Sequence, residues 1–93
     1  MIEKLTALSA LNKGERGIIV RIDETRLPHN VELKRGELEQ RLLEIGFVEG
    51  VEVTVLHFGL IHRDPIAIAL GSSAMTVAIR RNEAAIVLVK PIT

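Results

Sequence analysis

Three residues with metal-ligating side chains lie close together in the chain, at His57, His62 and Asp64. Imidazole nitrogens and carboxylate oxygens are ligands that Fe(II) and Zn(II) accept. Structural and catalytic metal sites, however, usually require three or four protein ligands that converge on one ion. His29 lies in a separate stretch and joins such a site only if the fold brings it there. We therefore expect any Fe(II) or Zn(II) at His57, His62 and Asp64 to be bound weakly, and we expect no required cofactor.

The same stretch, together with Ser72 and Ser73, contains the residue types of a Ser-His-Asp triad. A triad needs a serine held against its histidine base and a pocket that stabilises the transition state. The sequence Gly-Ser-Ser beginning at Gly71 is more typical of a turn than of a nucleophile. The chain also lacks the G-x-x-x-x-G-K-S/T loop that cradles nucleotide phosphates. We expect no catalytic residues, and a protein that is not an enzyme.

The composition limits the classes of partner. Twelve Lys and Arg residues balance twelve Asp and Glu residues, so no net charge attracts a nucleic-acid backbone or an anionic membrane surface. Trp and Tyr, on which single-stranded bases often stack, are absent, and so is cysteine. The longest apolar run, residues 84–89, is far shorter than the ~20 residues of a membrane helix. We expect a cytoplasmic protein that binds no nucleic acid and does not insert into a membrane.

The pattern of apolar residues predicts a single, mainly β domain over residues 1–93. Strands are expected at residues 17–22, 51–55, 65–70, 75–79 and 86–89. About five short strands, one short helix and tight turns in so few residues favour a small, strongly bent sheet that closes as a barrel.

The one helix of this arrangement is expected after the first strand. Leu38, Leu42 and Ile45 have the i, i+4, i+7 spacing of a helix face. Gly46 can end this helix in a left-handed conformation, and Phe47 can then fold back onto Leu42. A single helical turn capped by Asn82 is expected before the last strand.

The alternation of the second strand changes after Val55. Val51, Val53 and Val55 are expected to face the core, which places Leu56 and Phe58 on the solvent face. A twist or a bulge could instead turn these residues inward, where burying each one would stabilise the fold by roughly 1.5 to 3 kcal/mol. If they are exposed, they mark an interaction surface. The candidate partner-binding residues are Leu56, Phe58, Leu60, Ile61 and, at the end of the helix, Phe47.

Three segments in this order resemble the FeoA family. They are RLLEIGFVEGVEVTVL at 41–56, DPIAIAL at 64–70 and VAIRRNEAAIVLV at 77–89. The resemblance implies an SH3-like barrel with one helix inserted after the first strand. It also implies an accessory protein of ferrous iron uptake that docks onto the cytoplasmic part of the FeoB-type transmembrane GTPase.

Two segments depart from the family pattern. The chain has His62-Arg63-Asp64-Pro65 where the family usually has a Gly-Asp-Pro turn, and it has a longer connection at residues 23–36. Two other functions remain open. The chain could be a metal-sensing module that binds Fe(II) or Zn(II) directly, or a domain that forms a homo-oligomer through the same apolar residues.

Overall fold

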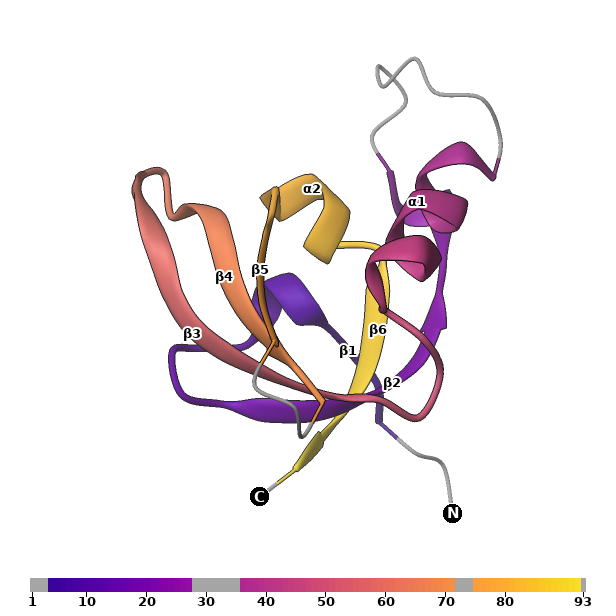
Figure 1. The fold of residues 1–93 in the computed structure, drawn as a ribbon, viewed down its shortest axis with the longest axis horizontal. Coiled ribbons are helices and arrows are strands. Elements are labelled where there is room, and N and C mark those ends of the chain that lie inside the picture. Colours follow the sequence, from indigo (N-terminus) through magenta and orange to yellow (C-terminus); the bar gives the residue numbers. More distant parts are fainter. Residues whose placement is uncertain (1–3, 28–35, 72–74, 93) are drawn as a thin grey trace.

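The computed structural model describes residues 4–27, 36–71 and 75–92. Its strands form one antiparallel sheet in the order β1-β6-β2-β3-β4-β5. The described elements are β1 (Thr6–Ala7), η1 (Leu8–Ala10), β2 (Arg16–Ile22), η2 (Glu24–Arg26), α1 (Glu37–Ile45), β3 (Glu52–Ile61), β4 (Asp64–Leu70), β5 (Met75–Ile79), α2 (Arg81–Ala84) and β6 (Val87–Ile92). The sheet bends strongly, so that β3 and β4 rise on one side and β6 and β2 on the other (Figure 1).

The sheet has a small SH3-like fold, but it is not closed as the sequence led us to expect. Hydrogen bonding stops at β5 on one side and at the two-residue strand β1 on the other. The described strands number six instead of five, because Thr6 and Ala7 pair with Val89 and Leu88 before the chain turns into η1. A strand of two residues is too short to show an alternation of apolar and polar residues, so β1 could not be predicted from the sequence.

Helix α1 contains Leu38, Leu42 and Ile45, and it ends at the glycine where its sequence pattern predicts. Gly46 has a φ of 127°, and its N–H donates to the carbonyl oxygens of Leu42 and Leu43. The N–H of Phe47 also donates to the Leu42 oxygen, at 3.0 Å. Both Leu42 and Phe47 are fully buried in the hydrophobic core. The predicted glycine stop, with the phenyl ring brought back to the helix, is confirmed.

The core fills the concave side of the sheet. Its fully buried side chains come from η1, β2, α1 and the later strands, and they are almost all aliphatic. The largest are Phe47, Leu8, Ile19, Leu42, Ile66, Ile68, Ile86, Val53, Val55, Val87 and Val89. Val53 and Val55 of β3 therefore face inward as predicted, and Ile66 and Ile68 of β4 face inward with them.

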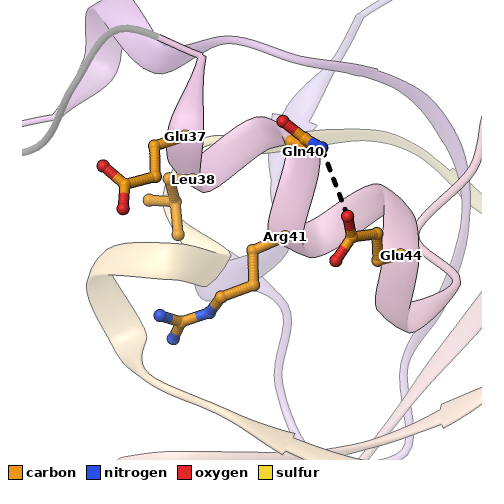
Figure 2. A pocket seen from close by; sticks show the side chains of 5 residues that line it. All are labelled: Glu37, Leu38, Gln40, Arg41 and Glu44. Carbon is orange, nitrogen blue, oxygen red and sulfur yellow. Dashed lines mark hydrogen bonds between the residues drawn. The ribbon is translucent and has the colours of Figure 1, made fainter.

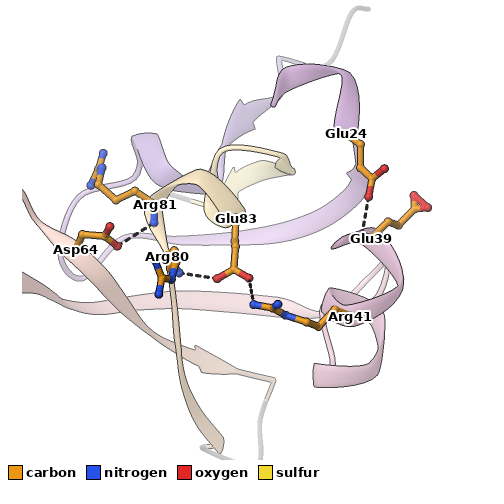
Figure 3. Close-up of polar contacts among 7 residues, drawn as sticks. All are labelled: Glu24, Glu39, Arg41, Asp64, Arg80, Arg81 and Glu83. Carbon is orange, nitrogen blue, oxygen red and sulfur yellow. Dashed lines mark hydrogen bonds and ion pairs between the residues drawn. The ribbon is translucent and has the colours of Figure 1, made fainter. Parts of the chain in front are cut away.

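Helix α2 begins two residues earlier than a cap at Asn82 would place it. Arg80 occupies the N-cap, and its N–H donates to Oε1 of Glu83 at 2.8 Å. The N–H of Arg81 donates to Oδ1 of Asp64, at 3.0 Å. Two N–H groups at the start of this short helix thus bind carboxylates, one local and one from β4, and Asn82 is not the cap (Figure 3).

Two segments singled out in the sequence cannot be compared with the structure. The Ser72-Ser73 part of the β4–β5 turn lies outside the described residues, and so does most of the connection between η2 and α1, which includes His29.

Candidate docking surface

The β3–β4 hairpin is irregular, and the irregularity decides which apolar residues face water. Val55 pairs with Ile68 while His57 pairs with Ala67, so Leu56 is an extra residue on β3. A bulge of this kind adds one residue to one strand and thereby reverses the alternation of side chains beyond it. His57 is accordingly exposed.

The reversal turns Phe58 toward the core. Its ring is half-buried and packs against the buried cluster, and Leu56 is also half-buried. The expectation that Phe58 lies on the solvent face is therefore wrong, and the bulge that the sequence left open as an alternative is the reason. Leu56 is the extra residue of the bulge, and its half-buried side chain is not among those that pack against the core. An even alternation along β3 would have exposed both side chains.

A second extra residue lies nearer the end of the hairpin. Phe58 pairs with Ile66 and Ile61 with Asp64, which leaves one unmatched residue on β3 at Gly59 or Leu60. Beyond it Leu60 and Ile61 extend into solvent, with exposed fractions of 102% and 74%. These two residues are the part of the predicted apolar cluster that the structure leaves exposed. The β3–β4 turn stands apart from α1 and α2 at one end of the molecule (Figure 1).

The turn itself contains only His62 and Arg63, both with positive φ, at 55° and 60°. These angles are those of a two-residue type I′ turn, which usually contains Asn or Gly. The sequence signal for such a turn was missing, because neither residue is a common turn former. Arg63 folds back so that its guanidinium carbon lies 4.1 Å from the centre of the Phe58 ring. A cation at this position is attracted by the negative face of the ring.

Phe47 is not part of this surface. It was expected to contribute to partner binding, but its side chain is fully buried against Leu42. The same backbone turn that ends α1 places the ring in the core, where it is inaccessible to a partner.

The residues predicted to bind a metal do not converge. His57 is exposed on β3, His62 lies in the turn, and the Asp64 carboxylate accepts a hydrogen bond from the Arg81 N–H. Among the described residues, no three metal-ligating side chains are grouped closely enough to hold an ion. The ligand set His57, His62 and Asp64 is thus not assembled in the described part of the chain.

Polar contacts fix the base of the hairpin and the helices behind it (Figure 3). Asp64 joins β4 to α2 through the Arg81 N–H, and Nη2 of Arg81 donates to the Ser9 carbonyl in η1 at 3.1 Å. Glu83 is almost fully buried, and its Oε2 lies 2.7 Å from Nη2 of Arg41 on α1. These contacts hold the hairpin on a fixed support while its end stays free.

An open pocket on α1 offers a second, weaker candidate (Figure 2). It is lined by Glu37, Leu38, Gln40, Arg41 and Glu44, and Gln40 donates to Glu44 at 3.3 Å. Its volume of about 250 Å³ is below the ~300–1,000 Å³ of most small-molecule sites. Four of the five lining side chains are polar, so this pocket is a solvated helix face.

A match to a family model over nearly the whole chain identifies the family. Residues 6–91 match the model of the FeoA domain. The chain belongs to the FeoA family. This family is associated with ferrous iron transport. No curated protein sequence matches the chain significantly.

Solved FeoA structures have the same fold. One is a crystal structure of an iron uptake regulatory protein (FeoA), which is 26% identical with a TM-score of 0.72 and aligns 96% of this chain with 100% of its own. Another is FeoA of Stenotrophomonas maltophilia in complex with zinc, presented as a prokaryotic SH3 domain protein. It is 25% identical with a TM-score of 0.69, and the match covers 90% of this chain and 88% of that one.

A manganese-dependent transcriptional repressor bound to manganese shares the fold alone. It is 19% identical with a TM-score of 0.78, and the match covers 98% of this FeoA domain but only 38% of the repressor.

No helix in residues 4–27, 36–71 or 75–92 has the length and apolar character needed to cross a bilayer.

Proposed function

We propose that this FeoA domain is a non-enzymatic, cytoplasmic adaptor that docks onto the cytoplasmic part of the FeoB-type ferrous iron transporter. The observation that carries the proposal is the pair of exposed aliphatic side chains, Leu60 and Ile61, at the end of a supported hairpin. Covering exposed apolar groups with a partner is favourable because it removes them from water, and contiguous exposed apolar residues mark interaction sites.

The half-buried ring of Phe58 contributes to the same surface from below. Its inner part packs against the core, and its outer part lies under the Arg63 guanidinium. Leu60 and Ile61 are therefore the residues that enter the partner, while Phe58 and Leu56 position them from the strand.

The experiment that tests the proposal is capture of the full-length transporter, solubilised in detergent, by the immobilised FeoA domain. The variant Leu60→Ser with Ile61→Ser should abolish capture, since it removes the two exposed anchors. The matched control is Leu43→Ser, which makes the same kind of change at an exposed leucine on α1. Capture that survives the hairpin variant, or is lost only in the control, would show that the docking surface lies elsewhere.

Nucleotide dependence and metal dependence are measured in the same format. Repeating the capture with GDP and with a GTP analogue shows whether the state of the GTPase controls docking. Anaerobic calorimetry with Fe(II) and with Zn(II) separates the adaptor from a metal-sensing module, because an adaptor takes up no stoichiometric metal. Sedimentation at several concentrations shows whether the apolar residues instead hold two copies together.

A further inference from the structure

Arg63 is placed beside the apolar end of the hairpin without a carboxylate to neutralise it. Its guanidinium lies over the Phe58 ring, and among the described residues no acidic side chain forms an ion pair with it. The one acidic residue between positions 56 and 65 is Asp64, whose carboxylate binds the N–H of Arg81 at the base of the hairpin. The hairpin end therefore presents one fixed cation next to two exposed aliphatic side chains.

We propose that the partner of this surface offers an apolar pocket for Leu60 and Ile61, with a protein carboxylate at the rim that binds Arg63. This inference rests on the proposed docking function and adds the chemistry of the surface that receives the hairpin. Charge complementarity carries it, since a cation at the edge of an apolar contact selects an opposite charge on the partner.

The geometry favours a carboxylate over other acceptors. Stacking on the ring fixes the guanidinium and leaves N–H groups along its edge, and a planar fork of this kind matches the two oxygens of a carboxylate. Because the side chain is already held by the ring, less conformational entropy is lost on binding than for a free arginine. A lipid surface is the less favoured partner, because the chain carries no net charge and one arginine adds little attraction to an anionic bilayer.

The test measures the affinity of the FeoA domain, residues 1–93, for the detergent-solubilised transporter at about 50 mM and 500 mM salt. Three variants are compared with the wild type: Arg63→Asn, which removes the charge with a residue that tolerates the positive φ, Arg63→Lys and Arg63→Glu. The control is Arg21→Gln, which removes a charge from an exposed arginine on β2. Thermal midpoints of all variants are recorded beside the affinities.

We expect Arg63→Asn to weaken binding about tenfold at low salt, and Arg63→Glu to weaken it further. Arg63→Lys should fall between Arg63→Asn and the wild type, because it keeps the charge but loses the planar fork. The affinity of the wild type should fall with salt, and that of Arg63→Asn should fall much less. Arg21→Gln should behave as the wild type does.

Three results would overturn the inference, and they differ from one another. If Leu60→Ser with Ile61→Ser abolishes binding while Arg63→Asn binds as the wild type does, the docking function stands and the carboxylate is wrong. If the wild type does not bind, the docking function itself fails. If wild-type protein sediments with vesicles containing anionic lipid and Arg63→Asn does not, the acceptor is a lipid headgroup and not a protein carboxylate.

Discussion

Gly59 and Asp64 approach each other so closely across the β3–β4 hairpin that a methyl group on Gly59 would overlap the Asp64 carbonyl oxygen. The chain can make this approach only because residue 59 has no Cβ. The approach lies where β3 carries its second extra residue, immediately before Leu60 and Ile61. The exposure of the proposed docking residues thus depends on one glycine.

Replacing Gly59 by alanine should therefore distort the hairpin. We expect Gly59→Ala to lower the free energy of unfolding by about 3 kcal/mol, the upper end of the usual cost of overpacking, since backbone atoms cannot move aside as a flexible side chain does. Urea denaturation measures the loss. The control, Gly14→Ala, adds a methyl group in open space at a φ of 87° and should cost only about 1–2 kcal/mol. Equal losses in the two variants would contradict the steric explanation.

Substitutions at Leu60 and at Phe58 should differ in their effect on the free energy of unfolding. Leu60→Ser changes a side chain that is entirely in solvent and should alter the free energy of unfolding by no more than about 0.5 kcal/mol. Phe58→Ser removes a ring that packs against the core and should cost about 2 kcal/mol. Thermal denaturation of the two variants checks this difference. A large loss in Leu60→Ser would mean that the residue is part of the fold and not of a free surface.

Glu83 should be the most sensitive charged position among these contacts. Glu83→Ala removes the acceptor of the Arg80 N–H and the partner of Arg41, and should cost about 1–3 kcal/mol. The value stays below that of a wholly buried pair, because the Arg41 side chain is 62% exposed. The control is Glu52→Ala, which breaks a surface pair with Arg16 at 3.6 Å and should cost less than about 1 kcal/mol. Chemical denaturation that finds equal losses would show that burial adds nothing to the Glu83 contacts.

Glu24 should stabilise the beginning of α1 from outside the helix. Its two carboxylate oxygens accept the N–H groups of Gly36 and Glu39, at 2.7 and 2.8 Å. Glu24→Ala should lower the free energy of unfolding by about 1 kcal/mol, as the loss of a capping side chain does. Hydrogen exchange should quicken at the first turn of α1, with little change in β4. Exposed Glu49 is the control, because Glu49→Ala should leave exchange at α1 unchanged.

The contribution of Asp23 to the stability of the fold should depend on pH. Hydrogen bonds from the Thr25 hydroxyl and then the Thr25 N–H hold the pKa of the Asp23 carboxyl below its ordinary value. A carboxyl whose pKa is lowered by folding stabilises the protein above its unfolded pKa of about 4, and the contribution is lost as pH falls through the lower folded value. Replacing Thr25 by valine should raise the pKa of Asp23 toward the ordinary value, as measured by an NMR titration. An unchanged titration would show that the hydroxyl does not cause the shift.

Much of the fold follows from local pattern. The period of the apolar residues located the helix that contains Leu38, Leu42 and Ile45 and five of the six described strands, and a glycine followed by phenylalanine marked the end of the helix. These signals are local because each depends on residues one turn or one pleat apart. The family could also be recognised from the sequence, because three of its motifs occur in order within those same helices and strands.

The docking surface could be predicted from the sequence only in part. The apolar run from Leu56 to Ile61 located it, but the run does not say which members face water. A bulge is set by the pairing of β3 with β4, and each extra residue exchanges the two faces beyond it. The face of Phe58 was therefore predicted wrongly from the sequence, and no local pattern indicated that the Arg63 guanidinium lies over its ring.

The sequence by itself determined an aliphatic core, a helix with a defined end and an apolar hairpin in a neutral chain. Only the tertiary structure decided that Phe47 is core, that His57, His62 and Asp64 stay apart, and that Leu60 and Ile61 are free. The reason is that burial and convergence depend on which strand lies opposite which, a relationship between distant residues that no local period records.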